Sequence, residues 1–131
     1  MFVDASAIVA ILAKEAEAEE FAVKIAAARQ VFLSPLGQYE AALGVARLLN
    51  IAADTAEVKI ADVMAFGGAR YVEITRRIGR EAVLAHELFG KGRHRARLNM
   101  GDCFSYACAK VLGVPLLCKG DDFCHTDIKI A

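Results

Sequence analysis

The chain has 131 residues, of which 56% are hydrophobic and 24% are charged. This length suits one domain and leaves no room for two independent cores, and it is enough to bury a core without disulfide staples. The composition excludes a disordered chain, and only 2 prolines leave no obvious linker. We therefore expect a single domain covering residues 1–131.

The formal net charge is zero, but the charges are unevenly distributed along the chain. Residues 1–69 carry 5 Lys/Arg against 9 Asp/Glu, whereas residues 70–97 carry 8 Lys/Arg against 3 Glu. This basic segment is suited to contacting a polyanion, although a solvated helix face followed by a charged loop explains the same pattern. Charge alone leaves both interpretations open.

The first half of the chain predicts strands and helices in alternation. A short apolar run ends on Asp4, and the segment that follows has the character of a helix with Asp4 or Ser6 near its N-cap. Pro35 suits the first turn of a later helix, in which Glu40 lies about one and a half turns from the start. The predicted strands are residues 1–3 and 31–33, and the predicted helices are residues 5–12, 15–29, 35–50 and 54–66.

The second half continues this alternation. Gly67 and Gly68 end the preceding helix, a strand is predicted over residues 71–74, and Thr75 caps a helix that reaches Phe89. A basic connector over residues 93–97 leads to a helix that starts near Gly101 and Asp102 and ends near Leu112. The last predicted strand covers residues 114–118, and residues 119–122 turn away from it. The pattern predicts an α/β fold with a mostly parallel central sheet covered by helices on both faces.

The cysteines favour a reducing compartment. They form no CxxC pair and no zinc-finger spacing: Cys103, Cys108, Cys118 and Cys124. A metal site made of Cys118, Cys124 and His125 is disfavoured because no fourth ligand has suitable spacing. The apolar stretch over residues 5–13 is too short to span a membrane, and it follows an acid where a signal peptide would carry positive charge. We expect a cytoplasmic protein without a membrane partner.

Acidic residues stand at corresponding positions of several predicted elements. Asp4 follows the first strand, Asp121 and Asp122 follow the last, and Glu40 and Asp102 lie near the starts of two helices. Each one taken singly is explained more simply as a helix cap or a surface acid. Because parallel strands place their carboxyl ends at one edge of the sheet, the set is expected to converge on one crevice.

A shared crevice of carboxylates indicates a hard cation. The acids would raise one another's pKa unless a positive charge lay between them. Mg²⁺, or Mn²⁺, prefers oxygen ligands, takes one or two carboxylates directly and retains several waters. Such an ion can activate water against a phosphodiester. No Walker loop, GxGxxG element or Ser-His-Asp set competes with this interpretation.

The residues around these acids resemble those of the PIN-domain ribonucleases, specifically the VapC-type toxins of bacterial toxin–antitoxin pairs. The resemblance covers nearly the whole chain, and its most specific parts are the Asn-x-Gly-Asp and Gly-Asp-Asp-Phe stretches. The segments that carry it are Val-Asp-Ala-Ser-Ala at residues 3–7, the helix with Glu40, Leu-Asn-Met-Gly-Asp-Cys-Phe-Ser-Tyr-Ala at residues 98–107, and Leu-Cys-Lys-Gly-Asp-Asp-Phe at residues 117–123. The resemblance implies a three-layer α/β/α PIN-like fold.

The resemblance also implies roles for individual residues. Asp4 and Asp102 match the family's principal magnesium ligands, and Glu40 matches an acid that binds metal or orients the attacking water. The fourth acid falls at Asp121 or Asp122: many members have a Thr-Asn-Asp-type turn where this chain has Lys119-Gly120, so the alignment does not choose between the two, and we slightly prefer Asp122. Ser6 matches a supporting hydroxyl near the metal, although a helix-capping role explains it equally well.

Partners follow from the same resemblance. It implies a homodimer, a cognate VapB-type antitoxin and an RNA substrate, often transfer RNA or ribosomal RNA. An antitoxin would place a basic side chain in the acidic pocket. The RNA backbone would contact the basic run, since phosphate binding requires cations but no sequence information. That contact is expected at Lys91, Arg93, Arg95 and Arg97.

Three other functions fit the sequence less well. A haloacid-dehalogenase-type phosphatase requires a second Asp two residues after the first, where this chain has Ser6. A response-regulator receiver requires an Asp after a middle strand, where this chain has Ser34. The remaining alternative is a non-catalytic RNA-binding or regulatory PIN-like module, which is disfavoured because all the acids are present.

Overall fold

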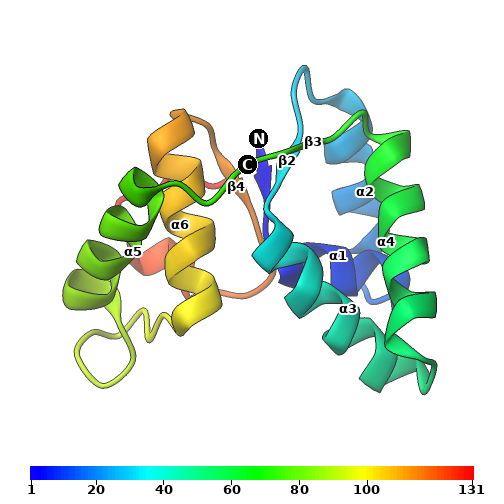
Figure 1. Ribbon diagram of the computed structural model, residues 1–131, viewed down its shortest axis with the longest axis horizontal. Helices are drawn as coiled ribbons and strands as arrows, with labels where there is room; N and C mark the ends of the chain where they lie inside the picture. Colours follow the sequence, from blue (N-terminus) through cyan, green and yellow to red (C-terminus); the bar gives the residue numbers. More distant parts are fainter.

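Four short parallel strands form the centre of the molecule in the computed structural model, which describes residues 1–131 (Figure 1). Their order in the sheet is β3-β2-β1-β4, so the chain moves outward from β1 on one side and returns to its other side with β4. The strands are β1 (Phe2–Val3), β2 (Phe32–Leu33), β3 (Arg70–Tyr71) and β4 (Leu116–Leu117). The predicted parallel sheet is confirmed.

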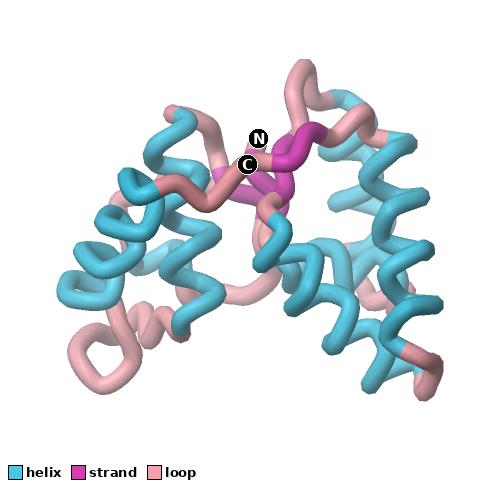
Figure 2. The backbone as a smooth tube through the Cα atoms, in the orientation of Figure 1, coloured by secondary structure: helices cyan, strands magenta, loops and turns pink.

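Helices cover the two faces of this sheet as separate groups (Figures 1 and 2). One group contains α5 and α6, which pack closely against each other, and the other contains α1 to α4. The helices are α1 (Ala5–Leu12), α2 (Ala18–Ala27), α3 (Pro35–Leu49), α4 (Ala53–Phe66), α5 (Arg76–Phe89) and α6 (Met100–Leu112), and a 3₁₀ turn spans Phe123–His125. The resulting three layers confirm the predicted α/β/α architecture.

Alternate residues of the central strands belong to two different cores. Phe2 and Leu116 pack with α5 and α6, whereas their chain neighbours Val3 and Leu117 pack with the helices on the opposite face. Successive strand side chains point to opposite faces, and a sheet covered on both sides therefore has apolar residues at every position. This arrangement leaves the ends of the strands, rather than their faces, available for a site.

Several predicted boundaries differ from those observed. The strand predicted over residues 71–74 is only Arg70–Tyr71, because its partner β2 ends at Leu33, next to Ser34, which caps α3, and the ladder cannot continue. The last strand is likewise shortened to Leu116–Leu117. The helix predicted over residues 15–29 starts at Ala18, after a turn in which Lys14 has a φ of 55°.

Side-chain caps fix the starts of four helices. Asp4, Ser34, Thr75 and Asn99 each accept a hydrogen bond from a backbone N–H of the first turn of their helix. Such caps satisfy donors that would otherwise lack partners, and they fix the direction in which the chain leaves a strand. None of the helices has both the length and the apolar content that crossing a bilayer requires.

Candidate active site

Asp4 lies at the carboxyl end of β1, where the order of the strands reverses. Its backbone N–H donates to the carbonyl of Leu117 in β4 at 2.9 Å, and its side chain is buried. Oδ2 accepts hydrogen bonds from the Ser6 backbone N–H at 2.9 Å and from the Ser6 hydroxyl at 2.6 Å. Oδ1 has no hydrogen bond within the protein, so one carboxylate oxygen caps α1 and the other remains available to a ligand.

Asp102 is the third residue of α6 and uses its two oxygens in the same way. Its Oδ2 accepts from the Asn99 backbone N–H at 2.8 Å, while its own N–H donates to Asn99 Oδ1 at 3.1 Å. This reciprocal pair is a capping box. Oδ1 of Asp102 makes no hydrogen bond within the protein. Two helix starts thus present one unused oxygen each.

Glu40 on α3 completes a set of mutually repelling charges with these two residues. Burial, and then the negative charges of Asp4 and Asp102, raise the pKa of Glu40 from 4.5 to about 7. Burial, together with the charges of Asp4 and Asp122, raises the pKa of Asp102 from 3.8 to about 6, against the lowering effect of the Asn99 hydrogen bond. The Glu40 carboxylate makes no hydrogen bond within the protein. The structure therefore brings Asp4, Glu40 and Asp102 within electrostatic reach of one another, and Asp122 within reach of Asp102.

The loop after β4 distinguishes its two adjacent acids. Both are exposed, but only Asp122 carries a charge that acts on Asp102, and the charge of Asp121 has no such effect. The loop is tied to α1 by the Lys119 backbone N–H, which donates to the Ser6 hydroxyl at 3.0 Å. Ser6 therefore connects Asp4 to the loop that carries Asp122, and Asp4 rather than Ser6 is the N-cap of α1.

No basic side chain of the protein neutralises these acids. None of the four forms an ion pair, and the nearby Lys119 instead directs its Nζ to Glu15 at 2.9 Å and to Glu17 at 3.2 Å. Carboxylates that share a half-buried space without a counter-charge destabilise the fold unless an ion or a partner supplies one.

The donor set is compatible with a hydrated divalent ion. No three His, Cys, Asp or Glu side chains lie close enough together to ligate one ion directly. The side chains thus offer no ready-made set of three direct ligands, and all four cysteines are free thiols. Two acids with one unused oxygen each, backed by further acids at longer range, fit an ion that keeps most of its water, as Mg²⁺ and Mn²⁺ do.

The basic residues predicted to contact RNA lie in the loop that leads into α6. Lys91, Arg93, Arg95 and Arg97 are all exposed, and only Arg93 has an ion-pair partner, Glu87 at 3.0 Å. The loop is closed at its base by the Lys91 backbone N–H, which donates to the carbonyl of Leu98 at 3.0 Å. Three cations without an ion-pair partner thus lie on a segment whose last basic residue, Arg97, is four residues before Gly101.

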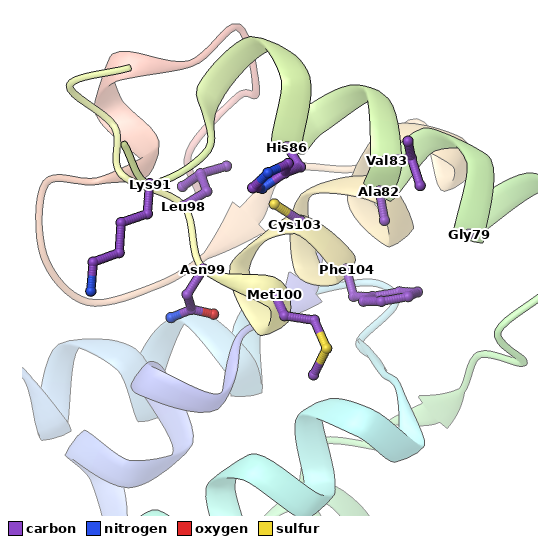
Figure 3. Close-up of a pocket in the computed structure, with 10 residues that line it drawn as sticks. All are labelled: Gly79, Ala82, Val83, His86, Lys91, Leu98, Asn99, Met100, Cys103 and Phe104. Atoms are coloured by element: carbon purple, nitrogen blue, oxygen red, sulfur yellow. The ribbon is translucent and has the colours of Figure 1, made fainter. Parts of the chain in front are cut away.

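A mainly apolar pocket of about 330 Å³ lies between α5 and the start of α6, a feature that the sequence did not predict (Figure 3). Its walls include His86, Met100, Cys103 and Phe104, and Lys91 extends away from the others at one end. In the neighbouring loop, the ring nitrogen Nδ1 of His94 already has a hydrogen-bond partner, since it accepts from the Ala96 backbone N–H at 3.1 Å.

Comparison with known proteins gives a consistent result. The family description "PIN domain" matches residues 1–129. A VapC ribonuclease of Mycobacterium bovis and ribonuclease VapC30 of Mycobacterium tuberculosis are each 39% identical over 98% of this chain and 95% of the relative. A VapC ribonuclease of Rhizobium meliloti is 38% identical over 97% of this chain and 98% of its own length.

A solved structure supports the fold independently. The crystal structure of VapC20 of Mycobacterium tuberculosis, described as a sarcin-ricin loop cleaving toxin, superimposes with a TM-score of 0.75. It covers 99% of this chain and 97% of that one, with 18% sequence identity. At this level of identity the similarity establishes the arrangement of helices and strands.

Proposed function

The chain belongs to the PIN-domain family, and within it to the VapC ribonucleases, and from this premise we propose that it is a Mg²⁺-dependent endoribonuclease and the toxin of a VapBC-type pair. The observation that carries the proposal is the convergence of four carboxylates at the carboxyl edge of the sheet without a cation among them. Such an arrangement lowers the stability of the fold. A divalent ion would offset the repulsion between the acids and would act on a bound phosphodiester.

Asp4 and Asp102 are the proposed metal ligands, each through the Oδ1 oxygen that its helix cap does not use. When bound, Mg²⁺ or Mn²⁺ would lower the pKa of a coordinated water and polarise the phosphoryl oxygen. Glu40, which lies beside both ligands and makes no hydrogen bond within the protein, would orient or deprotonate the attacking water. Asp122 would add negative charge from the loop, and Ser6 would hold both the loop and Asp4 in place.

The proposed substrate is RNA, with transfer RNA and ribosomal RNA as the expected classes. Lys91, Arg93, Arg95 and Arg97 would contact the phosphate backbone, because exposed cations beside an acidic site can hold a polyanion that the acids themselves repel. These contacts would position the strand without selecting its sequence.

The proposed partners are a cognate VapB-type antitoxin and a second copy of the chain in a homodimer, within the cytoplasm. A basic antitoxin side chain would supply the counter-charge that the acids lack, and would thereby exclude the metal or the RNA. Exposed apolar side chains on α3 and α5, among them Tyr39, Leu43 and Val83, are suited to protein contact.

The test compares wild type with Asp4→Asn in an RNA cleavage assay containing Mg²⁺, with a chelator as the metal-free control. Asn is a good N-cap and can still accept the Ser6 N–H, so the variant should fold while losing one charge of the metal site. We expect cleavage to fall about 100-fold or more. Asp62→Asn is a matched control, because Asp62 is exposed on α4 and makes no ion pair.

Equal cleavage by wild type and Asp4→Asn would refute the metal-nuclease proposal. If wild type binds RNA without cutting it in Mg²⁺ or Mn²⁺, the chain would instead be a non-catalytic RNA-binding module. Sedimentation of the purified toxin, alone and with its antitoxin, tests the two proposed assemblies.

A further inference from the structure

Gly101 lies on α6 between Met100 and Asp102, and no feature of its backbone requires glycine. Its φ is not positive, in contrast to Gly113 and Gly120, which have φ values of 66° and 86°. Glycine inside a helix is unfavourable compared with alanine, so the reason for it must lie in the space around the Cα atom.

That space is filled by the carboxylate of Glu40. A Cβ atom added to Gly101 would overlap both carboxylate oxygens and the Cδ atom of Glu40, and these are its nearest neighbours. Gly101 is itself buried, so the carboxylate of α3 lies directly on the first turn of α6. This first turn also carries Asp102, whose charge contributes to the raised pKa of Glu40.

The obstructing atoms are the far end of a flexible side chain and not backbone. A methyl group at Gly101 could therefore be accommodated by rotation of Glu40, with α3 and α6 remaining in place. The same rotation would remove the carboxylate from Asp4 and Asp102. The substitution is thus expected to spare the fold and to disturb the acid cluster.

We propose that Gly101 is a positioning residue for Glu40: the missing side chain creates the space through which the Glu40 carboxylate reaches Asp4 and Asp102. The inference deepens the function proposed above and rests on it for the cleavage measurement. It gives the Gly-Asp pair of residues 101 and 102 two separate tasks, since Asp102 supplies an oxygen and Gly101 admits an acid from another helix.

A double-mutant cycle tests this role. The variants are Gly101→Ala, Glu40→Ala and the combination of both, each assayed for RNA cleavage and for Mn²⁺ affinity by titration. A displaced catalytic group commonly costs about 100-fold in rate, so Gly101→Ala should lower kcat to about that extent while leaving KM for RNA unchanged. Once Glu40 is alanine there is no carboxylate to displace, and adding Gly101→Ala should then have no further effect.

Gly79→Ala is the matched control for the cost of the methyl group. Gly79 also lies within a helix, α5, and a Cβ atom there would meet nothing within 4 Å. This variant should cleave RNA as wild type does. Thermal unfolding of all variants, followed by circular dichroism, should show that each keeps its helices.

Two results would overturn the proposal. The first is wild-type cleavage and Mn²⁺ affinity in Gly101→Ala. The second is a double variant whose losses multiply, or which fails to fold where Glu40→Ala folds, because either outcome would mean that Gly101 acts independently of Glu40. If wild type itself cuts no RNA, the proposed function fails, and the Mn²⁺ titrations still decide the role of Gly101: Gly101→Ala and Glu40→Ala should weaken Mn²⁺ binding alike, since each removes the Glu40 charge from beside Asp4 and Asp102, and the double variant should bind no more weakly than Glu40→Ala.

Discussion

Replacing Glu40 by Gln is expected to stabilise the metal-free protein at alkaline pH and to leave its stability at acid pH almost unchanged. The folded protein raises the pKa of Glu40 from 4.5 to about 7, first by burial and then through the charges of Asp4 and Asp102. A carboxyl group with a raised pKa contributes stability that is fully present below its unfolded pKa and is lost as the pH rises through the folded value. Gln removes the ionisation and hence the loss.

The pKa values set the size of the effect. At 1.36 kcal/mol per pKa unit, a rise from 4.5 to about 7 corresponds to at most about 3 kcal/mol. Because Glu40 is only half-buried and water screens it, we expect a gain of about 1–2 kcal/mol. The gain should be complete at about pH 8 and negligible at about pH 4, where the carboxyl group is protonated in both states.

The assay is urea unfolding in the presence of a chelator at these two pH values. Glu73→Gln is the control, since Glu73 is exposed and forms no ion pair, and its effect should stay within about 0.5 kcal/mol. A loss of stability in Glu40→Gln at alkaline pH, or an equal change at both pH values, would refute the view that Glu40 is held in a repulsive, partly dry environment.

Two further predictions concern the loop after β4 and the segment that follows it. Asp122→Asn should weaken Mn²⁺ binding and RNA cleavage more than Asp121→Asn, because only the charge of Asp122 acts on Asp102; equal effects in titration and cleavage assays would contradict the assignment. Tyr106→Phe should cost about 0.5–1.5 kcal/mol in urea unfolding, since it removes a buried hydroxyl that donates to Asp127 and accepts from Lys110, while the exposed Asp127 keeps its ion pair with Lys110.

The local sequence was sufficient to predict those parts of the fold that neighbouring residues determine. Thr75 caps the helix Arg76–Phe89 as predicted, because its hydroxyl needs only the N–H of Ile78, three residues later. The start of α6 near Gly101 and the end of α1 at Leu12 were also recognisable from nearby residues. Each of these depends on a contact within one helical turn.

Features that depend on contacts between residues far apart in the chain could not be predicted from the local sequence. The start of α2 depends on a turn whose Glu15 and Glu17 bind Lys119, more than a hundred residues along the chain. Asp121 and Asp122 are equivalent in any local pattern, and only in the folded chain does the charge of the second raise the pKa of Asp102. The fully buried Tyr106 lies on α6, but its hydroxyl partner Asp127 comes from a segment without a predicted element.

Asp4, Asp102 and Glu40 contribute differently to the stability of the metal-free protein, and this difference determines which substitution tests each of them. Asp4 and Asp102 each use one oxygen to cap a helix, so an alanine at either position loses a cap worth about 1 kcal/mol as well as a charge. Glu40 makes no hydrogen bond and contributes no cap, so its ionised carboxylate only lowers the free energy of unfolding of the metal-free protein. Asparagine at Asp4 or Asp102 therefore separates the chemistry from the fold, whereas at Glu40 any neutral residue does so. If all three neutral variants destabilised the metal-free protein alike, the acids would be structural, and the metal would have no part in their convergence.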